Sequence, residues 1–379
     1  MSNSNAGKRT IVLSANTSWY LYNFRASTIR RFLSEGYRVV CLSPEDDFSQ
    51  RLVEHVGCEW LPLNMDNKGK NPFKDIGLVL RFWQVYRLLR PVAAFHFTIK
   101  NNVYGTWAAR LLGVPAINNV SGLGTAFIRK GIVGGIVRLL YKLSMPLAYK
   151  VFCQNEEDLH LLIENKLVPQ DRLFLLPGSG VDLDAFHPGL LKPHEGEFRF
   201  LYAGRMLADK GLYELIAAVQ ALHAKGVHCS LWLCGFADVE NVSAISEAHL
   251  NEWGQQNNIE WLGPSDNMAS MYAQVDCVVL PSYREGMPRS LLEAGAMGLP
   301  VVATDVPGCR NIVSDGFNGL LCEVQSSESL QGALQRMLSM SDAERRAMGA
   351  NGRARVSEKF SEAIVIEAAV DAVRSCEKL

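Results

Sequence analysis

The sequence contains two successive rounds of strand–helix alternation, separated by one segment without a periodic pattern. Short β-branched runs that alternate with helical patterns are typical of a parallel sheet covered by helices. For the first round we predict helices at 26–35 and 102–112. The strands predicted there are 10–14, 38–43, 93–98, 116–120, 151–154 and 173–176. The segment 177–197 is rich in Gly and Pro and indicates a linker.

The second round follows this linker and has the same pattern. We predict strands at 198–203, 230–235, 259–262, 275–281 and 300–304. The helices predicted are 212–225, 268–274, 289–297, 326–340, 342–357 and 361–377. The sequence therefore predicts two facing Rossmann-like α/β domains, residues 1–180 and 198–357, followed by a tail helix within 358–379. In open parallel sheets, ligands bind at the carboxyl ends of the strands, so we expect a site there, in a cleft between the domains.

Composition limits the class of protein. A chain of 379 residues with 48% hydrophobic and 20% charged residues is typical of globular domains. We find no apolar stretch long enough to span a membrane, and the start MSNSNAGKRT has no hydrophobic region of a signal peptide. The nine cysteines form no CxxC pair and no Cys/His cluster, so we expect reduced, buried thiols and no bound metal.

The charge is distributed unevenly along the chain. Residues 60–155 carry 13 Lys and Arg, and only Asp66 and Asp75 oppose them. Within this region the segment 127–150 combines apolar residues with a basic side, which is typical of a helix that lies on an anionic membrane. An ordinary crossover helix with a solvated basic face is the alternative. We expect contact with a membrane surface and no nucleic-acid partner.

The strongest local motif is PSYREGMPRSLLEAGAMGLPVVATDVPG at 281–308. A strand ends here, a Gly/Pro loop carries Glu285, and the helix that starts near Arg289 carries Glu293. The free N–H groups of a helix start favour anionic or hydroxyl-rich ligands, and carboxylates accept hydrogen bonds from sugar hydroxyls. The alternative is a helix-capping Glu and an unrelated surface Glu.

A second motif, AGRMLADKG at 203–211, follows the first strand of the second round. Arg205 and Lys210 lie five residues apart between Gly204 and Gly211. A guanidinium and an ammonium at a strand end suit a diphosphate. Because Arg and Lys are common in loops, a structural role is the alternative for this pair alone.

Together these two motifs, with WLGPSD at 261–266 between them, resemble the retaining glycosyltransferases of family 4, which have the GT-B fold. The resemblance covers the whole second round. It implies that Arg205 and Lys210 hold the diphosphate of a nucleotide sugar, that Glu285 contacts the donor sugar and that Glu293 holds the ribose. It also implies a C-terminal helix that packs back on the first domain. Further donor-binding residues expected from the resemblance are Gly204, Trp261, Leu262, Gly263, Tyr283, Gly286, Met287, Pro288, Ser290 and Leu291.

The first round is similar to enzymes that extend undecaprenyl-diphosphate-linked glycans, on the stretch 95–127. On the acceptor side we expect Asn16, Lys100, Ser121 and Gly122. Several members of the family place a His or Glu near the reacting centre, where this chain has Asn118 to Gly122 without a titratable side chain. We therefore identify no general base, and we interpret His96 as a core histidine. Asp182-Leu183-Asp184 spells DxD but lies in the linker, so we interpret it as coincidence.

The sequence thus predicts a metal-independent, retaining transferase. It would move a hexose or N-acetylhexosamine from a nucleotide sugar, UDP rather than GDP, to a polyprenyl-diphosphate-linked saccharide in bacterial glycan or surface-polysaccharide assembly. We expect no cofactor and a cytoplasmic protein, peripheral on the inner face of the cytoplasmic membrane. Two alternatives remain: a nucleotide-sugar 2-epimerase on the same fold and a non-catalytic UDP-sugar-binding protein.

Overall fold

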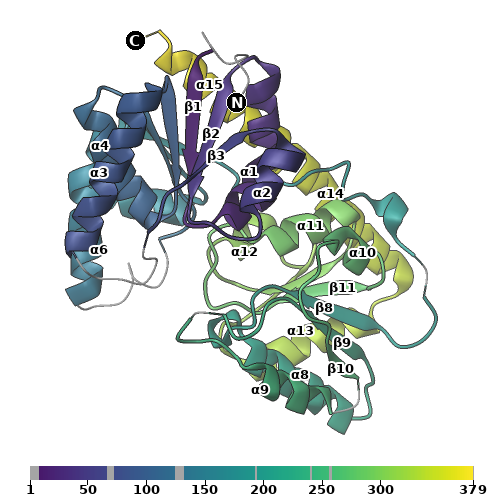
Figure 1. Cartoon of the computed structure of the whole chain (residues 1–379). Coiled ribbons are helices and arrows are strands. Elements are labelled where there is room, and N and C mark those ends of the chain that lie inside the picture. The colour runs from purple at the N-terminus through teal and green to yellow at the C-terminus, as the bar shows by residue number, and fades with distance from the viewer. Residues whose placement is uncertain are drawn as a thin grey trace. The chain divides into compact units, whose positions relative to one another are not determined.

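The computed structural model describes residues 8–65, 72–123, 132–192, 194–239, 241–255 and 258–378. The chain divides into two compact units, each with its own parallel sheet. The first unit consists of Met1–Ser179 together with Ala363–Leu379, and the second of Gly180–Glu362. Figure 1 shows the elements of each unit.

The first unit is built on a parallel sheet that has seven strands within the described residues, in the order β3-β2-β1-β4-β5-β6-β7. Its strands are β1 (Thr10–Ser14), β2 (Arg38–Ser43), β3 (Glu59–Pro62), β4 (Ala93–Phe97), β5 (Ala116–Val120), β6 (Lys150–Cys153) and β7 (Leu173–Leu175). All of β1 is buried, as expected for a parallel strand that is covered on both faces. Because side chains alternate along a strand, Val12 packs in one core, while Ile11 and Leu13 pack in the other.

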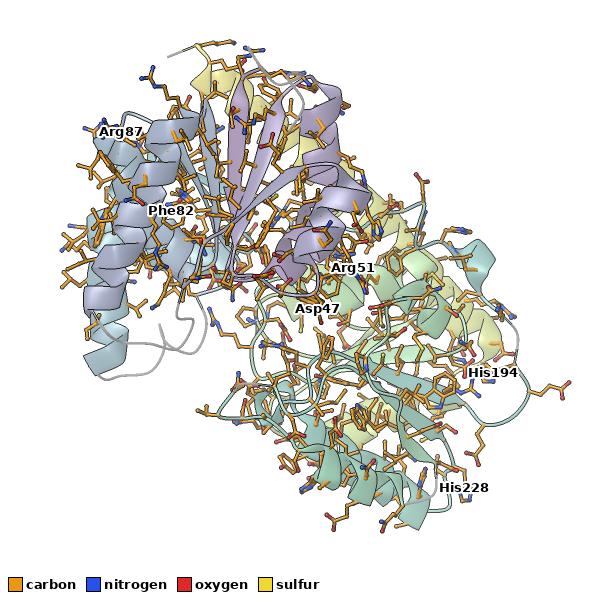
Figure 2. The ribbon with its side chains drawn as sticks, in the orientation of Figure 1. Asp47, Arg51, Phe82, Arg87, His194 and His228 are labelled. Carbon is orange, nitrogen blue, oxygen red and sulfur yellow. The ribbon has the colours of Figure 1, made fainter. Side chains whose placement is uncertain are left out.

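Helices cover both faces of this sheet. They are α1 (Ser18–Ser34), α2 (Ser49–Arg51), α3 (Pro72–Leu89), α4 (Thr106–Leu111), α6 (Ile132–Ser144) and α7 (Glu156–Glu164), together with the π-helical segments η2 (Leu52–Val56) and η3 (Asn101–Gly105). The core beside α3 contains the fully buried Phe82, whereas Arg87 of the same helix is exposed (Figure 2). On the other face α1 packs with the C-terminal helix α15 (Glu362–Cys376), whose Val365, Val370 and Val373 join the core of β1. The helix predicted to return to the first domain does so (Figure 1).

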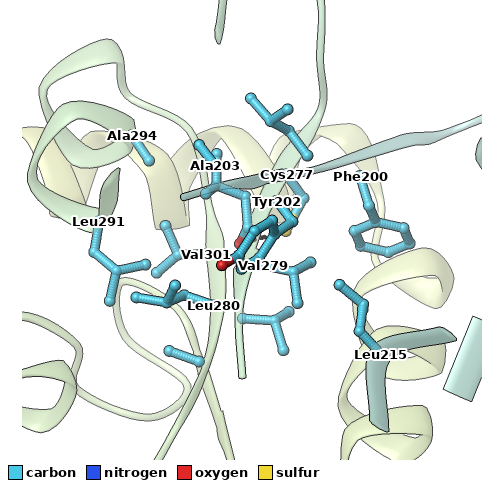
Figure 3. Close-up of a cluster of buried hydrophobic side chains, with 14 of the residues drawn as sticks. Phe200, Tyr202, Ala203, Leu215, Cys277, Val279, Leu280, Leu291, Ala294 and Val301 are labelled. Atoms are coloured by element: carbon cyan, nitrogen blue, oxygen red, sulfur yellow. Dashed lines mark hydrogen bonds between the residues drawn. The ribbon is translucent and has the colours of Figure 1, made fainter. Parts of the chain in front are cut away.

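The second unit has a parallel sheet of six strands among the residues described, in the order β10-β9-β8-β11-β12-β13. The strands are β8 (Arg199–Ala203), β9 (Ser230–Cys234), β10 (Ile259–Trp261), β11 (Cys277–Leu280), β12 (Val301–Thr304) and β13 (Leu320–Cys322). The helices are α8 (Leu212–Ala224), α9 (Glu247–Gly254), α10 (Met268–Tyr272), α11 (Arg289–Met297), α12 (Cys309–Ile312), α13 (Ser327–Ser339) and α14 (Asp342–Lys359). Figure 3 shows the core around Tyr202, where side chains of β8, β11 and α11 meet.

The predicted α/β architecture is confirmed, and the structure differs from the prediction in individual elements. The predicted helix at 26–35 begins at Ser18, because the Thr17 hydroxyl accepts a hydrogen bond from Tyr20 N and caps it. α6 runs through Gly134 and Gly135, although glycine is unfavourable inside a helix. Strands β3 and β13 were not predicted.

The predicted linker 177–197 is partly ordered against the second unit. Val181 forms a parallel bridge with Ser361, and Val181 and Phe186 belong to the core of that unit. Within the DxD sequence, the Asp182 carboxylate accepts hydrogen bonds from the backbone N–H groups of Asp184 and Ala185. These bonds give Asp182 a turn-forming role.

Candidate functional site

The two sequence motifs meet at one end of the second sheet, although Lys210 and Glu285 lie 75 residues apart in the chain. β8 and β11 are neighbours, and the strand order reverses direction between them. Loops that follow two such strands diverge to opposite faces of the sheet and leave a crevice, where ligands of open α/β sheets bind. The loop after β8 carries Arg205 and Lys210, and the loop after β11 carries Glu285. The topology therefore brings both predicted motifs to one switch point.

An ion pair joins the two loops directly. The Lys210 ammonium contacts Glu285 Oε1, with 19% and 13% of the two side chains exposed. Since this pair is only partly hydrated, its charges are weakly screened and hold each other in place. Arg205 is exposed, and its carbonyl accepts a hydrogen bond of 2.8 Å from the Tyr202 hydroxyl. Lys210 and Glu285 thus form a preorganised pair, with Arg205 on the same loop.

Two glycines allow the loop backbones to approach closely. Gly211 has φ +74°, and a Cβ there would lie 2.0 Å from the Pro281 carbonyl oxygen. Gly308, with φ +83°, also has no room for a side chain, since its Cβ would come 2.7 Å from the Gly286 carbonyl oxygen. At both positions the positive φ and the close carbonyl oxygen exclude a side chain. No role was predicted for Gly308, because only the tertiary structure places it beside Gly286.

Glu293 lies one turn into α11 and is almost completely buried, with 8% of its side chain exposed. Arg289 Nε donates to Glu293 Oε1 at 2.6 Å, and the Tyr272 hydroxyl donates to Oε2 at 2.9 Å. Arg289 and Tyr272 were not predicted as site residues. The i,i+4 spacing of Arg289 and Glu293 is a signal that could have identified the ion pair. For Tyr272 no such signal exists, because it comes from α10.

Other predicted residues lie in the neighbouring loops or in the core of the second unit. Gly235, at the end of β9, donates its N–H to the Gly263 carbonyl at 2.9 Å, and its own carbonyl accepts from Trp261 Nε1 at 3.1 Å. The Tyr283 hydroxyl donates to Glu214 at 2.7 Å, and burial together with this carboxylate raises the pKa of Tyr283 to about 12. Leu291 is fully buried in the core (Figure 3). Its side chain therefore supports α11.

The remaining predicted residues of this loop follow one another at the start of α11. Pro288 is the N-cap residue of the helix, which begins at Arg289 as predicted. Gly286 and Met287 precede it, and Ser290 lies in the first turn. Gly204 directly follows β8 and donates its N–H to the Cys234 carbonyl at 2.9 Å. Leu262 follows β10 and donates its N–H to the Leu233 carbonyl at 2.9 Å.

The predicted acceptor-side residues gather at the carboxyl edge of the first sheet. β1, β4 and β5 are adjacent, and the strand order reverses between β1 and β4. Asn16 follows β1, Lys100 follows β4, and Ser121 and Gly122 follow β5 directly. The sheet therefore brings them to its own switch point. Their binding role stays a prediction.

His96 of β4 lies beneath this edge in a buried polar layer. Its Nε2 is 2.8 Å from the Tyr86 hydroxyl and its Nδ1 is 2.8 Å from Asn118 Oδ1. Because the amide oxygen only accepts, Nδ1 carries the proton and Nε2 accepts from Tyr86. Burial lowers the pKa of His96 to about 4, so the ring is neutral at physiological pH. Its interpretation as a core histidine is confirmed.

Two further expectations concern metal and membrane sites. Among the described residues, no group of three or more His, Cys, Asp or Glu side chains could hold a metal ion. All nine cysteines are free and buried. None of the helices in the described part of the chain combines the length and apolar character needed to cross a bilayer. Of the basic segment 127–150, residues 127–131, including Arg129 and Lys130, lie outside the described residues.

The chain is similar to known glycosyltransferases. Residues 187–355 match the family model described as Glycosyl transferases group 1, a range that contains both loops of the site. The N,N'-diacetylbacillosaminyl-diphospho-undecaprenol alpha-1,3-N-acetylgalactosaminyltransferase of Campylobacter jejuni is 26% identical over 341 residues, which is 84% of this chain and 86% of that protein. The UDP-Gal:alpha-D-GlcNAc-diphosphoundecaprenol alpha-1,3-galactosyltransferase of Escherichia coli is 26% identical over 275 residues, 70% of each protein.

The fold is shared with solved structures of low sequence identity. Anabaena Alr3699/HepE, solved in complex with UDP and glucose, superposes with a TM-score of 0.79 at 16% identity. The match covers 97% of this chain and 100% of that one.

Proposed function

We propose that this glycosyltransferase, which has the GT-B fold and whose residues 187–355 match the Glycosyl transferases group 1 family model, transfers a sugar from a UDP-sugar to a polyprenyl-diphosphate-linked saccharide. The observation that carries this proposal is the Lys210–Glu285 pair at the switch point of the second sheet. It places a cation for the diphosphate beside a carboxylate for the hydroxyls of the donor sugar.

In the proposed donor site, the basic residues face the diphosphate and the carboxylates face the hydroxyl groups of the two sugars. As the bond between the sugar and the diphosphate breaks, negative charge grows on the β-phosphate. Arg205 and Lys210 would stabilise this charge without a metal ion, since both are held on the loop after β8 before the reaction. Glu285 would hold the transferred sugar, and Glu293 would accept hydrogen bonds from the ribose.

The names of the relatives support the choice of substrates. The Escherichia coli relative is named for a UDP-Gal donor, a diphosphoundecaprenol-linked acceptor and an alpha-linked product. An alpha-linked product is the result of retention when the donor sugar is α-linked. We therefore propose a UDP-sugar donor, retention of configuration and assembly of a bacterial glycan or surface polysaccharide. With His96 neutral and buried, we propose that the acceptor proton passes to the leaving phosphate oxygen.

A donor and acceptor panel tests the proposed function. We expect transfer from a UDP-hexose or UDP-N-acetylhexosamine to a lipid-diphosphate monosaccharide, unchanged by EDTA, with the product mass raised by one sugar. An α linkage in the product, read by NMR, would support retention. Conversion of UDP-N-acetylglucosamine without any acceptor would instead identify an epimerase. UDP binding without transfer to any lipid acceptor would identify a binding protein.

We further propose that the first unit binds an anionic membrane surface through α6. Its side chains Ile136, Leu139 and Leu143 are 53–56% exposed, and their spacing places them on one stripe. Arg138 and Lys142 accompany this stripe on the same helix. Exposed aliphatic side chains together with cations suit the interface of an anionic bilayer. The protein would then lie on the inner face of the cytoplasmic membrane, where its lipid-linked acceptor is available.

Charge reversal on α6 tests this membrane proposal. We expect sedimentation with phosphatidylglycerol vesicles that salt reverses. Binding of Arg138→Glu/Lys142→Glu should be weaker by at least about thirtyfold, since each of the two lost cations contributes about 1 kcal/mol near an anionic surface and the new carboxylates are repelled by it. Leu139→Glu should also weaken binding. Val242→Glu is the control, because Val242 is 98% exposed but belongs to the second unit. Wild-type protein that stays unbound at low salt would contradict the proposal.

A further inference from the structure

We propose that Tyr272 is a positioning residue of the donor site, which fixes the Glu293 carboxylate so that it accepts both hydroxyls of the nucleotide ribose. This inference rests on the proposed function, because it assumes that Glu293 contacts the ribose. Tyr272 ends α10, 21 residues before Glu293, and belongs to neither of the two motifs. Its role becomes visible only when α10 and α11 pack together.

The geometry gives each oxygen of the carboxylate one protein donor. The Tyr272 hydroxyl donates to Oε2 at 2.9 Å, and Arg289 Nε donates to Oε1 at 2.6 Å. An ionised carboxylate offers about four acceptor positions, so each oxygen can still accept one more hydrogen bond. Two neighbouring acceptors of this kind match the two O–H donors of a ribose 2′,3′-diol.

The surroundings hold this arrangement in place. Tyr272 is fully buried, and its ring packs edge-on against Phe186 with 6.0 Å between the centroids. Burying a carboxylate is unfavourable unless it is paired and hydrogen-bonded, and Arg289 balances the charge of Glu293. Burial, reinforced by the Glu293 charge, raises the pKa of Tyr272 well above its usual value. The hydroxyl therefore remains a donor at physiological pH.

The test compares UDP with dUDP, which lacks the 2′-hydroxyl. Wild-type protein should bind UDP more tightly than dUDP in calorimetry. In Tyr272→Phe we expect the affinity for UDP to fall about tenfold and the affinity for dUDP to fall by less than about threefold. The difference is expected because only UDP has the 2′-hydroxyl that would donate to the Glu293 carboxylate. If Tyr272 only stabilised the fold, the variant should lose affinity for UDP and for dUDP by the same factor. The Phe ring keeps the packing against Phe186.

Two controls separate the possible outcomes. Tyr86→Phe also removes a buried, hydrogen-bonded hydroxyl, but in the first unit, so the ratio of UDP to dUDP affinity should stay at the wild-type value. Arg289→Lys removes the Nε donor without changing Tyr272. This variant should also have a lower ratio of UDP to dUDP affinity than the wild-type protein. An unchanged ratio of UDP to dUDP affinity in Tyr272→Phe would overturn the inference, whatever the result for Arg289→Lys. Wild-type protein that does not bind UDP would contradict the proposed donor itself.

Discussion

Replacing Lys210 with alanine is expected to lower kcat by about a hundredfold to a thousandfold, the usual effect of removing one preorganised group that stabilises transition-state charge. Among the described residues, Glu285 forms an ion pair with Lys210 alone. Its loss therefore removes a cation from the proposed diphosphate site and also the charge that holds Glu285. Arg205→Ala should have an effect of similar size, since the guanidinium lies on the same loop.

The two contributions of Lys210 can be separated with Glu285→Gln. If Lys210 only holds Glu285, then Lys210→Ala should cause no further loss in the Glu285→Gln background. If it also stabilises the leaving diphosphate, as we propose, kcat should fall again by at least about tenfold. Lys225→Ala is the matched control, because it removes an exposed lysine of the same unit. Full turnover in Lys210→Ala or in Arg205→Ala would refute the assignment of the site.

Replacing Gly211 with alanine is expected to lower kcat/KM by more than about a hundredfold, through the backbone alone. The new Cβ would lie 2.0 Å from the Pro281 carbonyl oxygen, and the φ of +74° is unfavourable for any L-residue. The loop after β8 must therefore move away from the loop after β11. Tyr283, whose N–H donates to the Asp209 carbonyl at 3.0 Å, would move with it.

Gly226 provides the matched control for Gly211. Its φ is +75°, and nothing lies within 4 Å of the position of a Cβ. Gly226→Ala should lower the free energy of unfolding by about 1 kcal/mol and leave kcat/KM unchanged. The two variants share the strain and differ only in the contact with Pro281. Equal activities, measured with the same donor and acceptor, would show that the close approach of the loops is not required.

The fold class could be predicted because it depends on local patterns. Buried parallel strands appear as short β-branched runs, so strands 10–14, 38–43 and 116–120 were predicted with the bounds that the structure has. Elements with weaker patterns, such as β3, were missed, since their burial comes from neighbours distant in sequence. The start of α1 was missed because the cap at Thr17 was overlooked.

By itself, the sequence determined which residue types could form the donor site. Arg205 and Lys210 follow one strand, Glu285 and Glu293 follow another, and each motif has a spacing that suits a phosphate or hydroxyl ligand. Only the tertiary structure decided that β8 and β11 are neighbours and that Lys210 pairs with Glu285. It also decided the close contacts of Gly211 and Gly308 and the bond from Tyr272 to Glu293. The physical reason is that strand order and helix packing are set by contacts between distant residues, which no single motif contains.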